Sequence, residues 1–430
     1  MQTPRPGEPE LQAEDATDAL LDGDQPLRRG TARAALRHRD FRIVFAGTFA
    51  SNVGTWMQNV LLGAWAQHMW HDTAYVGALY FAQLGPLLFL SAVGGALTDQ
   101  VNRRRFVIVT QVEQLIGSVV LAVLVAVPDP SQLAVFLCVL AIGIGAALGA
   151  PALGAIQPNL VPREDLSGAV SLQSVQLNLS RMIGPAIGAP LYALFGAAIV
   201  FGLNAGTYLF AIIALVVAHY PARTNHPPGG GVLSKLASGL RISWHDRLIR
   251  RILIVLVLFS FFCLAFVGLM PSIAEHSLHM DTDRAQYGIL YALFGLGAAV
   301  GAIGVGSFFA DHARTPMVRL ALLGFAVLLA AFSLVRTPSA AFAVVPFLGF
   351  AYFVVITALS TVLQEHLDDA VRGRVVALWI MGFGGMVPVG VYAFGTLAGR
   401  TSLTEVLFVG VVVAVLLAWY ADLRAVGAPS

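Results

Sequence analysis

Charged residues are scarce in this sequence, and cysteine and lysine are almost absent. Only 12% of the 430 residues are Asp, Glu, Lys or Arg, whereas 57% are hydrophobic. The two cysteines, Cys138 and Cys263, both lie inside apolar runs. That placement favours small buried side chains and argues against a disulfide or a cysteine metal site. Lys235 is the one lysine, so nearly all positive charge is carried by arginine.

Several catalytic motifs are missing as well. No Gly-x-x-x-x-Gly-Lys-Ser/Thr loop occurs, which argues against ATP hydrolysis, and there is no His-Glu-x-x-His sequence. The histidines and acids of residues 275–284 are interpreted as a solvated external loop and not as a metal site. We therefore expect no enzyme, no metal and no cofactor. The net charge of +2 is not gathered on a soluble basic surface, so no nucleic-acid partner is expected.

Long apolar stretches fill the chain instead. A bilayer core is about 30 Å thick, and a helix needs about 20 mostly apolar residues to span it. Twelve stretches approach or exceed that length, and none holds more than one Asp, Glu, Lys or Arg. They predict an all-α integral membrane protein with twelve transmembrane helices. The stretches are Ile43–Ala66, Ala74–Thr98, Phe106–Val127, Leu133–Leu160, Leu166–Leu194, Ala197–Ala218, Ile252–Ala274, Ala285–Ala310, Pro316–Val335, Ala340–Leu363, Val375–Gly399 and Leu403–Tyr420.

Arginine placement predicts the orientation. When termini and loops are assigned alternately to two sides, one side receives most arginines, including the run Arg103–Arg105, and the other receives Arg284, Arg336 and Arg400. The positive-inside rule places the rich side, with both termini, in the cytoplasm. The expected location is a bacterial inner membrane.

The chain divides into two parts around its longest internal loop. Residues 1–35 are predicted to be a disordered cytoplasmic tail, and residues 221–248 a cytoplasmic linker that breaks at Pro227-Pro228-Gly229. Leu236, Leu240 and Trp244 recur at helical spacing in that linker, which indicates an amphipathic surface helix, although a plain linker is the alternative. The remaining parts, 36–220 and 249–424, are the predicted six-helix bundles.

The two parts carry matching marks. Gly95, Asp99, Arg103 and Arg104 follow the second run, and Gly306, Asp311 and Arg314 follow the eighth. The aspartates are 311 − 99 = 212 residues apart. A repeat of this length is typical of transporters built from two pseudo-symmetric bundles around a central cavity.

These residues resemble a known family. Gly95-x-x-x-Asp99-x-x-x-Arg103-Arg104 is similar to the loop signature of the major facilitator superfamily, with Asn102 where that pattern has Gly; Asn tolerates positive φ, so the turn is expected to survive. Gln157-Pro158 and Arg181-x-x-Gly184-Pro185-x-x-Gly188 resemble the branch of enterobactin exporters and drug efflux permeases. The resemblance covers about residues 36–422 and implies transport, not a particular cargo.

Charges at the loop signature suggest a gate. Asp99, Arg103 and Arg104, with Asp311 and Arg314 in the second part, can interact with helix dipoles and pin the bundles together on one face. The alternative is that the arginines only fix the topology of the loop.

The fifth run carries a second cluster of candidates. Gln173, Gln176 and Gly184 share one helix face, with Arg181 beside it near mid-membrane. A buried cation needs a partner or a wet cavity, so Arg181 is expected to face the cavity or the seam between bundles; a local lock to helix-end carbonyls is the alternative. Gly184, Pro185 and Gly188 indicate a kink, or close packing.

Polar side chains on other runs complete the expected cavity. Asn52, Trp56 and Asn59 lie along one stripe of the first run, and Gln83 and Ser260 are further candidates. Polar residues of membrane helices usually face the protein interior. Helix–helix hydrogen bonding is the alternative role for these residues.

One acidic residue, Glu113, lies well inside a span. It is the candidate proton carrier, and a structural Glu bonded to the loop arginines is the alternative. The sequence thus favours a monomeric secondary transporter that exports amphiphilic, weakly charged small molecules by proton antiport. An uptake permease, a lipid flippase, and a membrane-embedded receptor or enzyme are the alternatives.

Overall fold

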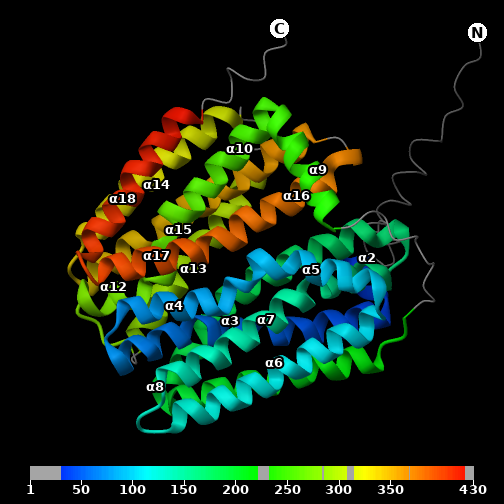
Figure 1. Ribbon diagram of the computed structural model, residues 1–430, viewed down its shortest axis with the longest axis horizontal. Helices are drawn as coiled ribbons and strands as arrows, with labels where there is room; N and C mark the ends of the chain where they lie inside the picture. The colour runs from blue at the N-terminus through cyan, green and yellow to red at the C-terminus, as the bar shows by residue number, and fades with distance from the viewer. Residues whose placement is uncertain (1–30, 221–231, 283–284, 308–313, 368, 422–430) are drawn as a thin grey trace, which may run out of the picture.

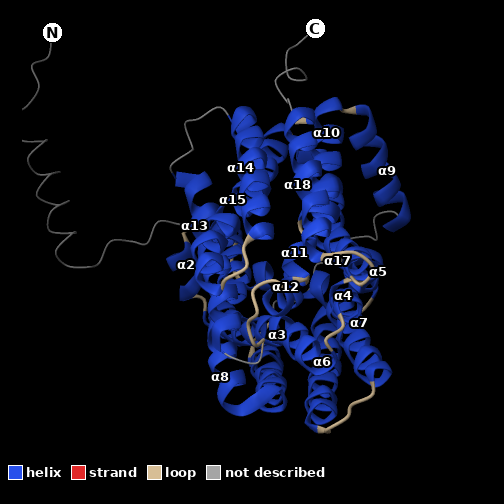
Figure 2. Ribbon diagram, turned by 90° about the vertical axis from the view of Figure 1, so that its left-hand side faces the viewer, coloured by secondary structure: helices blue, strands red, loops and turns tan. Residues whose placement is uncertain are grey.

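The computed structural model describes residues 31–220, 232–282, 285–307, 314–367 and 369–421. Every regular element within these ranges is helical (Figure 2). The α-helices are α2 (Ala32–Arg37), α3 (Arg39–Trp70), α4 (Thr73–Leu84), α5 (Pro86–Gln100), α6 (Arg103–Ala126), α7 (Gln132–Ile156), α8 (Leu166–Val217), α9 (Val232–His245), α10 (Arg247–Leu258), α11 (Ala265–Gly268), α12 (Met270–His276), α13 (Ala285–Ser307), α14 (Arg314–Leu334), α15 (Pro338–His366), α16 (Asp369–Ile380), α17 (Met386–Ala398) and α18 (Leu403–Tyr420). Short 3-10 turns, η1 (Gln157–Leu160) and η2 (Arg163–Asp165), and π-helical turns, η3 (Phe259–Cys263) and η4 (Met381–Gly385), connect some of them.

Nine of the described helical segments are long and apolar enough to cross a membrane. The expected class, an all-helical membrane protein, therefore agrees with the structure. The tail before Thr31, Asp311 and most of the loop before α9 lie outside the described residues. Glu275 and His276, expected in a loop, instead end α12, because Pro271 opens a further helical segment after Leu269.

Local sequence explains where the helices begin and break. Asp72, Ser131 and Ser402 cap α4, α7 and α18 with their side-chain oxygens. The long helix α8 leaves helical geometry at Gly196, whose φ of 78° and ψ of 173° suit glycine above other residues. This residue stands between the fifth and sixth apolar runs of the sequence.

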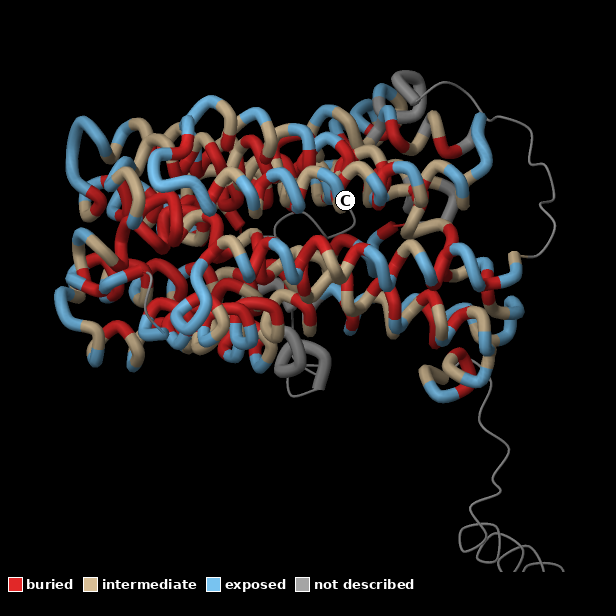
Figure 3. Tube along the Cα trace, turned by 90° about the horizontal axis from the view of Figure 1, so that it is seen from below, coloured by how far each residue is buried: buried red, intermediate tan, exposed pale blue. Residues whose placement is uncertain are grey.

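The apolar core is divided between the two parts of the chain that precede and follow the longest internal loop. One cluster of buried residues is built from α10 to α18, with Val60 and Ala64 added from α3. Two smaller clusters lie among α2 to α8. We refer to residues 31–220 as the N-terminal half and residues 232–421 as the C-terminal half; they lie side by side along the length of the molecule (Figures 1 and 3).

Two long helix pairs join the halves. Helix α4 packs against α17, and α8 packs against α13. Small residues allow the close approach: a Cβ added at Gly77 would lie 2.9 Å from the carbonyl oxygen of Val391, and one added at Gly288 would collide with Ala189. Between these two seams the halves leave the space that holds the candidate site.

Candidate substrate cavity and gates

A cavity of about 860 Å³, counted with the open space at its mouth, lies between the halves. Helices from both halves line it. Its side chains are mostly aromatic or small, and Arg181 is the charged residue among them. The lining residues are Trp56, Tyr80, Leu84, Arg181, Met182, Leu264, Val267, Tyr291, Phe294, Gly295, Ala298, Ala299, Tyr352, Phe353, Phe383, Gly384 and Val387.

Arg181 and Trp56 meet in the wall of this cavity. The Arg181 Cζ atom lies 4.8 Å from the centre of the Trp56 ring, a cation–π contact. The position is deep: Arg181 is 181 − 166 = 15 residues from the start of α8 and 196 − 181 = 15 from its break at Gly196. Arg181 Nε is buried and has no hydrogen-bond partner among the described residues. Both residues were candidates from sequence, and the structure brings them together.

Three tyrosines of this cavity were not singled out from the sequence. Tyr80, Tyr291 and Tyr352 line it together with Arg181. Phe294 stacks on Tyr352 with ring centres 5.8 Å apart. One signal was available: Tyr352 stands in the middle of its apolar run, whereas membrane tyrosines usually gather at the interfaces.

A smaller neighbouring cavity of about 440 Å³ continues along α3 and α4. Asn59 and Gln83, both predicted cavity residues, line it. Gln83 Nε2 donates to Asn59 Oδ1 over 2.6 Å. These two amides therefore combine both expected roles, since they face a cavity and also link two helices.

Other polar candidates lie elsewhere. Gln176 is buried and donates to Thr48 Oγ1 over 3.0 Å, and Gln157 donates to the same oxygen over 2.6 Å. Ser260 is fully buried within η3, and its Oγ has no partner among the described residues. Gln176 and Ser260 are absent from the lining of the described cavities, as are two further candidates, Gln173 and Asn52.

The glycines of α8 bring two helices together. A Cβ at Gly184 would lie 2.7 Å from the Val53 carbonyl oxygen and 2.9 Å from Trp56 Cβ, and one at Gly188 would collide with Met57. Pro185 lies inside the helix, and the departure from helical geometry comes at Gly196. The geometry of Gly184 and Gly188 thus matches the packing interpretation.

Glu113 lies away from the cavity. Its carboxylate fills the space left by Gly145 on α7, since a Cβ there would collide with Glu113 Oε2. That oxygen has no hydrogen-bond partner among the described residues. Its role as a proton carrier and its alternative role as a structural Glu bonded to the loop arginines both stay predictions.

The loop signature is anchored within the N-terminal half. Arg104 Nε donates to the Leu215 carbonyl oxygen over 2.8 Å, a second nitrogen donates to that of Val216, and its Cζ lies 5.0 Å from the centre of the Tyr220 ring. Asn102 has a φ of −66°, so positive φ is not the reason it replaces Gly; its side chain instead caps α6 by accepting from Arg105 N.

Other gate candidates are less completely described. Gly95 lies in α5 with open space where a Cβ would stand. Arg103 begins α6. The side chains of Asp99 and Arg314 lie outside what the structure describes, as does the whole of Asp311.

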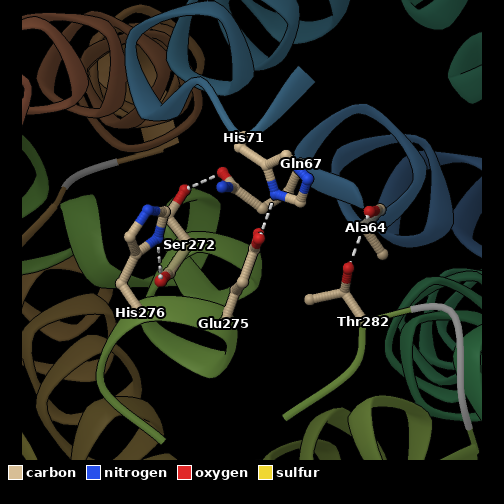
Figure 4. Close-up of polar contacts among 7 residues, drawn as sticks. All are labelled: Ala64, Gln67, His71, Ser272, Glu275, His276 and Thr282. Carbon is tan, nitrogen blue, oxygen red and sulfur yellow. Dashed lines mark hydrogen bonds and ion pairs between the residues drawn. The ribbon is translucent and has the colours of Figure 1, made fainter. Parts of the chain in front are cut away.

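At the opposite end, around His71, described residues of the two halves are joined by hydrogen bonds (Figure 4). His71 Nδ1 pairs with Glu275 Oε1. Ser272 Oγ donates to Gln67 Oε1 over 2.5 Å, and Thr282 Oγ1 donates to the Ala64 carbonyl oxygen over 3.0 Å. We call this cluster the His71 latch (Ala64, Gln67, His71, Ser272, Glu275 and Thr282); sequence reasoning did not find it, because no local pattern pairs α3 with α12.

Comparison with known proteins identifies the family to which this chain belongs. The profile of the Transmembrane secretion effector family matches residues 30–428. The chain is 31% identical over 349 residues to enterobactin exporter EntS from Escherichia coli O139:H28, which covers 80% of this chain and 81% of the exporter. Its counterpart from Escherichia fergusonii gives the same identity and coverage.

Solved structures share the fold. The nucleoside transporter NupG superposes with a TM-score of 0.72 at 13% identity, over 91% of this chain and 100% of that one. An inward-facing, unoccupied bacterial homologue of the lysosomal transporter Spinster gives 0.72 at 14% identity, over 91% and 99%. Apolar helices, a central cavity and these likenesses define a multi-pass transporter of the major facilitator superfamily. Within it, the chain belongs to the Transmembrane secretion effector family.

Proposed function

We propose that this chain is a secondary active transporter that exports an amphiphilic small molecule by alternating access, driven by proton antiport. The observation that carries the proposal is a central cavity lined by both halves and closed toward one end by the His71 latch. If the halves rock about this cavity, it opens to each side in turn. Similarity to an enterobactin exporter supports the outward direction.

Twelve membrane spans are part of this proposal. Nine helical segments qualify by length and composition. The segment that contains α8 is counted twice because of its break at Gly196, and α3 and α13 add one span each, so 9 + 1 + 1 + 1 = 12. Six then fall in each half, with α9 in the connection between the halves.

Orientation follows from the arginines. With Arg103 to Arg105 in the cytoplasm, as the positive-inside rule requires, both termini are cytoplasmic. The His71 latch then faces away from the cytoplasm. We infer that this state is closed toward the outside of an inner membrane.

Cross-linking across the latch tests alternating access. In a background without Cys138 and Cys263, we introduce Gln67→Cys and Ser272→Cys, whose native side chains touch. Oxidation is expected to abolish efflux from loaded cells or vesicles, because the latch must open to release cargo, and reduction is expected to restore it.

A matched pair within one half controls for cross-linking itself. His38 Nε2 and Asp165 Oδ2 lie 2.9 Å apart, both in the N-terminal half. His38→Cys with Asp165→Cys is expected to leave efflux intact when oxidised. Undiminished efflux with a complete Gln67–Ser272 cross-link would contradict alternating access through this latch.

A further inference from the structure

Arg181 is a cation without a counter-charge in the described cavities. Its guanidinium carries N–H donors and no acceptor. No ion pair or hydrogen bond joins it to another described residue, and Nε is buried and unsatisfied. Arg181 is half-buried, and a charge held among apolar helices without a counter-charge is costly; the Trp56 ring offsets only part of that cost. This side chain is therefore poised to receive an anion.

The rest of the wall supplies no carboxylate. Neither the main cavity nor its smaller neighbour is lined by Asp or Glu among the described residues. The Glu113 carboxylate packs against Gly145, between α6 and α7. The cavity thus presents one positive charge, which attracts anions and disfavours lipophilic cations.

Aromatic rings surround this charge. Tyr80, Tyr291 and Tyr352 offer hydroxyl groups as further donors and ring faces for stacking, and Phe294 already stacks on Tyr352. Phe383 and Gly384 come from the π-helical turn η4, a feature often found at functional sites. Flat aromatic groups fit such walls better than flexible aliphatic chains.

We infer that the cargo is an aromatic acid, whose anionic group pairs with Arg181 while its ring packs among Trp56, Tyr291, Tyr352 and Phe294. This inference rests on the proposed transport function, since it names the class of molecule that the same cavity carries. It replaces the weakly charged cargo expected from the sequence. The charge and the ring contribute separately, so each can be tested with its own probe.

Equilibrium binding to the purified full-length protein in detergent tests the charge. The probes are 2-naphthoate and its uncharged isostere 2-naphthamide, measured by calorimetry. We expect naphthoate to bind at least tenfold more tightly, a difference of about 1.4 kcal/mol. In Arg181→Gln the preference is expected to fall below threefold, and in Arg181→Lys to remain in part because the charge is kept. Equal binding of acid and amide by the native protein would overturn the inference.

Two controls make the result specific. Arg336, which bonds to Ser333 and Thr404 and lies outside the cavity lining, is changed to Gln and is expected to keep the full preference. Cyclohexanecarboxylate is expected to bind at least tenfold more weakly than naphthoate, and equal affinity would remove the aromatic half of the inference. An unchanged acid preference in Arg181→Gln that retains native gel-filtration and unfolding profiles would also overturn it.

Failure of this inference is separable from failure of the proposed function. Selective naphthoate binding without outward transport of any probe would keep the cargo class and refute export. Efflux that the oxidised latch blocks, with no preference for the acid, would keep export and refute the cargo class.

Discussion

At the scale of single residues, Asp246 links two helix ends. Its carboxylate caps α10 by accepting from Leu248 N over 2.8 Å and from Ile249 N over 3.0 Å, and it meets His366 Nε2 of α15 at 2.8 Å. Burial alone, the largest single effect, raises the pKa of Asp246. The hydrogen bonds from Ile249, His366 and Leu248, together with the charge of His366, outweigh it and lower the pKa below 3.8.

Acid is therefore expected to remove a measurable part of the stability. A carboxyl whose pKa is lowered by folding contributes above its unfolded value of about 3.8 and loses that contribution as the pH falls through the lower native pKa. Asp246→Asn keeps a capping oxygen but not the charge, whereas Asp246→Ala also loses the cap, at about 1 kcal/mol. Apparent unfolding temperatures of the native protein and the two variants between pH 7 and pH 3 measure the effects of the charge and of the cap. A gap between native and Asn variants that does not shrink in acid contradicts this assignment.

Glu113 is the residue on which proton coupling is predicted to depend. Glu113→Gln is expected to weaken efflux driven by a pH gradient, because the amide cannot exchange a proton. The readout is efflux from inverted vesicles with and without an imposed gradient. Glu405→Gln, the same change at the exposed first turn of α18, serves as the control. Unaltered pH dependence in Glu113→Gln would move the proton path elsewhere.

Residue types predicted that a side chain lies inside the protein better than they predicted whether it packs within one half or lines a cavity. Gln176 and Asn59 carry similar amides inside apolar runs, yet Gln176 bonds to Thr48 within one half and Asn59 faces a cavity. Periodicity defines a face of a helix, but the rotation of that face relative to its neighbours is set by tertiary packing. The same limit hid the tyrosines around Arg181 and the His71 latch.

At the scale of elements, α8 makes its most extensive contact with α3. Gly184 permits it, and the approach holds Trp56 beneath Arg181. The apolar runs predicted where these helices lie, because length and hydrophobicity decide which segments enter a bilayer. They could not predict the π-helical turns η3 and η4, since a local change in hydrogen-bond pairing leaves no periodic signature.

A single added methyl group tests this contact. Gly184→Ala would place Cβ within 3 Å of Val53 O, Met57 N and Trp56 Cβ, so the helices must separate. We expect a loss of about 1–3 kcal/mol in stability, together with weaker probe binding as Trp56 moves. Gly202→Ala, on the same helix with open space around it, is expected to stay within about 0.5 kcal/mol of native. Thermal unfolding of the two variants compares them directly, and equal profiles would exclude a tight contact.

At the scale of the whole molecule, we expect the His71 latch to favour one state of the proposed two-state cycle. Removing contacts that exist only in the closed form shifts the population toward the other form. Glu275→Ala removes the partner of His71 while leaving the Gln67–Ser272 hydrogen bond in place. The effect is therefore expected to be a partial shift and not a permanently open gate.

Labelling of a cavity residue measures that shift. Ala299, which lines the cavity, is replaced by cysteine in the background without native cysteines. With an impermeant maleimide, Glu275→Ala is expected to raise the labelling rate from the His71 end by several-fold and to lower it from the other end. Glu405→Ala, outside the latch, is expected to change neither rate. Identical rates with and without Glu275 would mean that the latch does not hold the closed state.

Glycine allows close contact at one point on each seam between the halves. Gly77 faces Val391 on one seam, and Gly288 faces Ala189 on the other. Helices that interdigitate must disengage their side chains before they can slide, and each disengagement adds to an activation barrier, whereas smooth backbone surfaces pass one another with little friction. We therefore expect the helices to slide past one another easily at these two points. If the proposed cycle operates, we expect the ease of this sliding to influence its turnover frequency and its dependence on temperature, separately from how tightly any cargo is held.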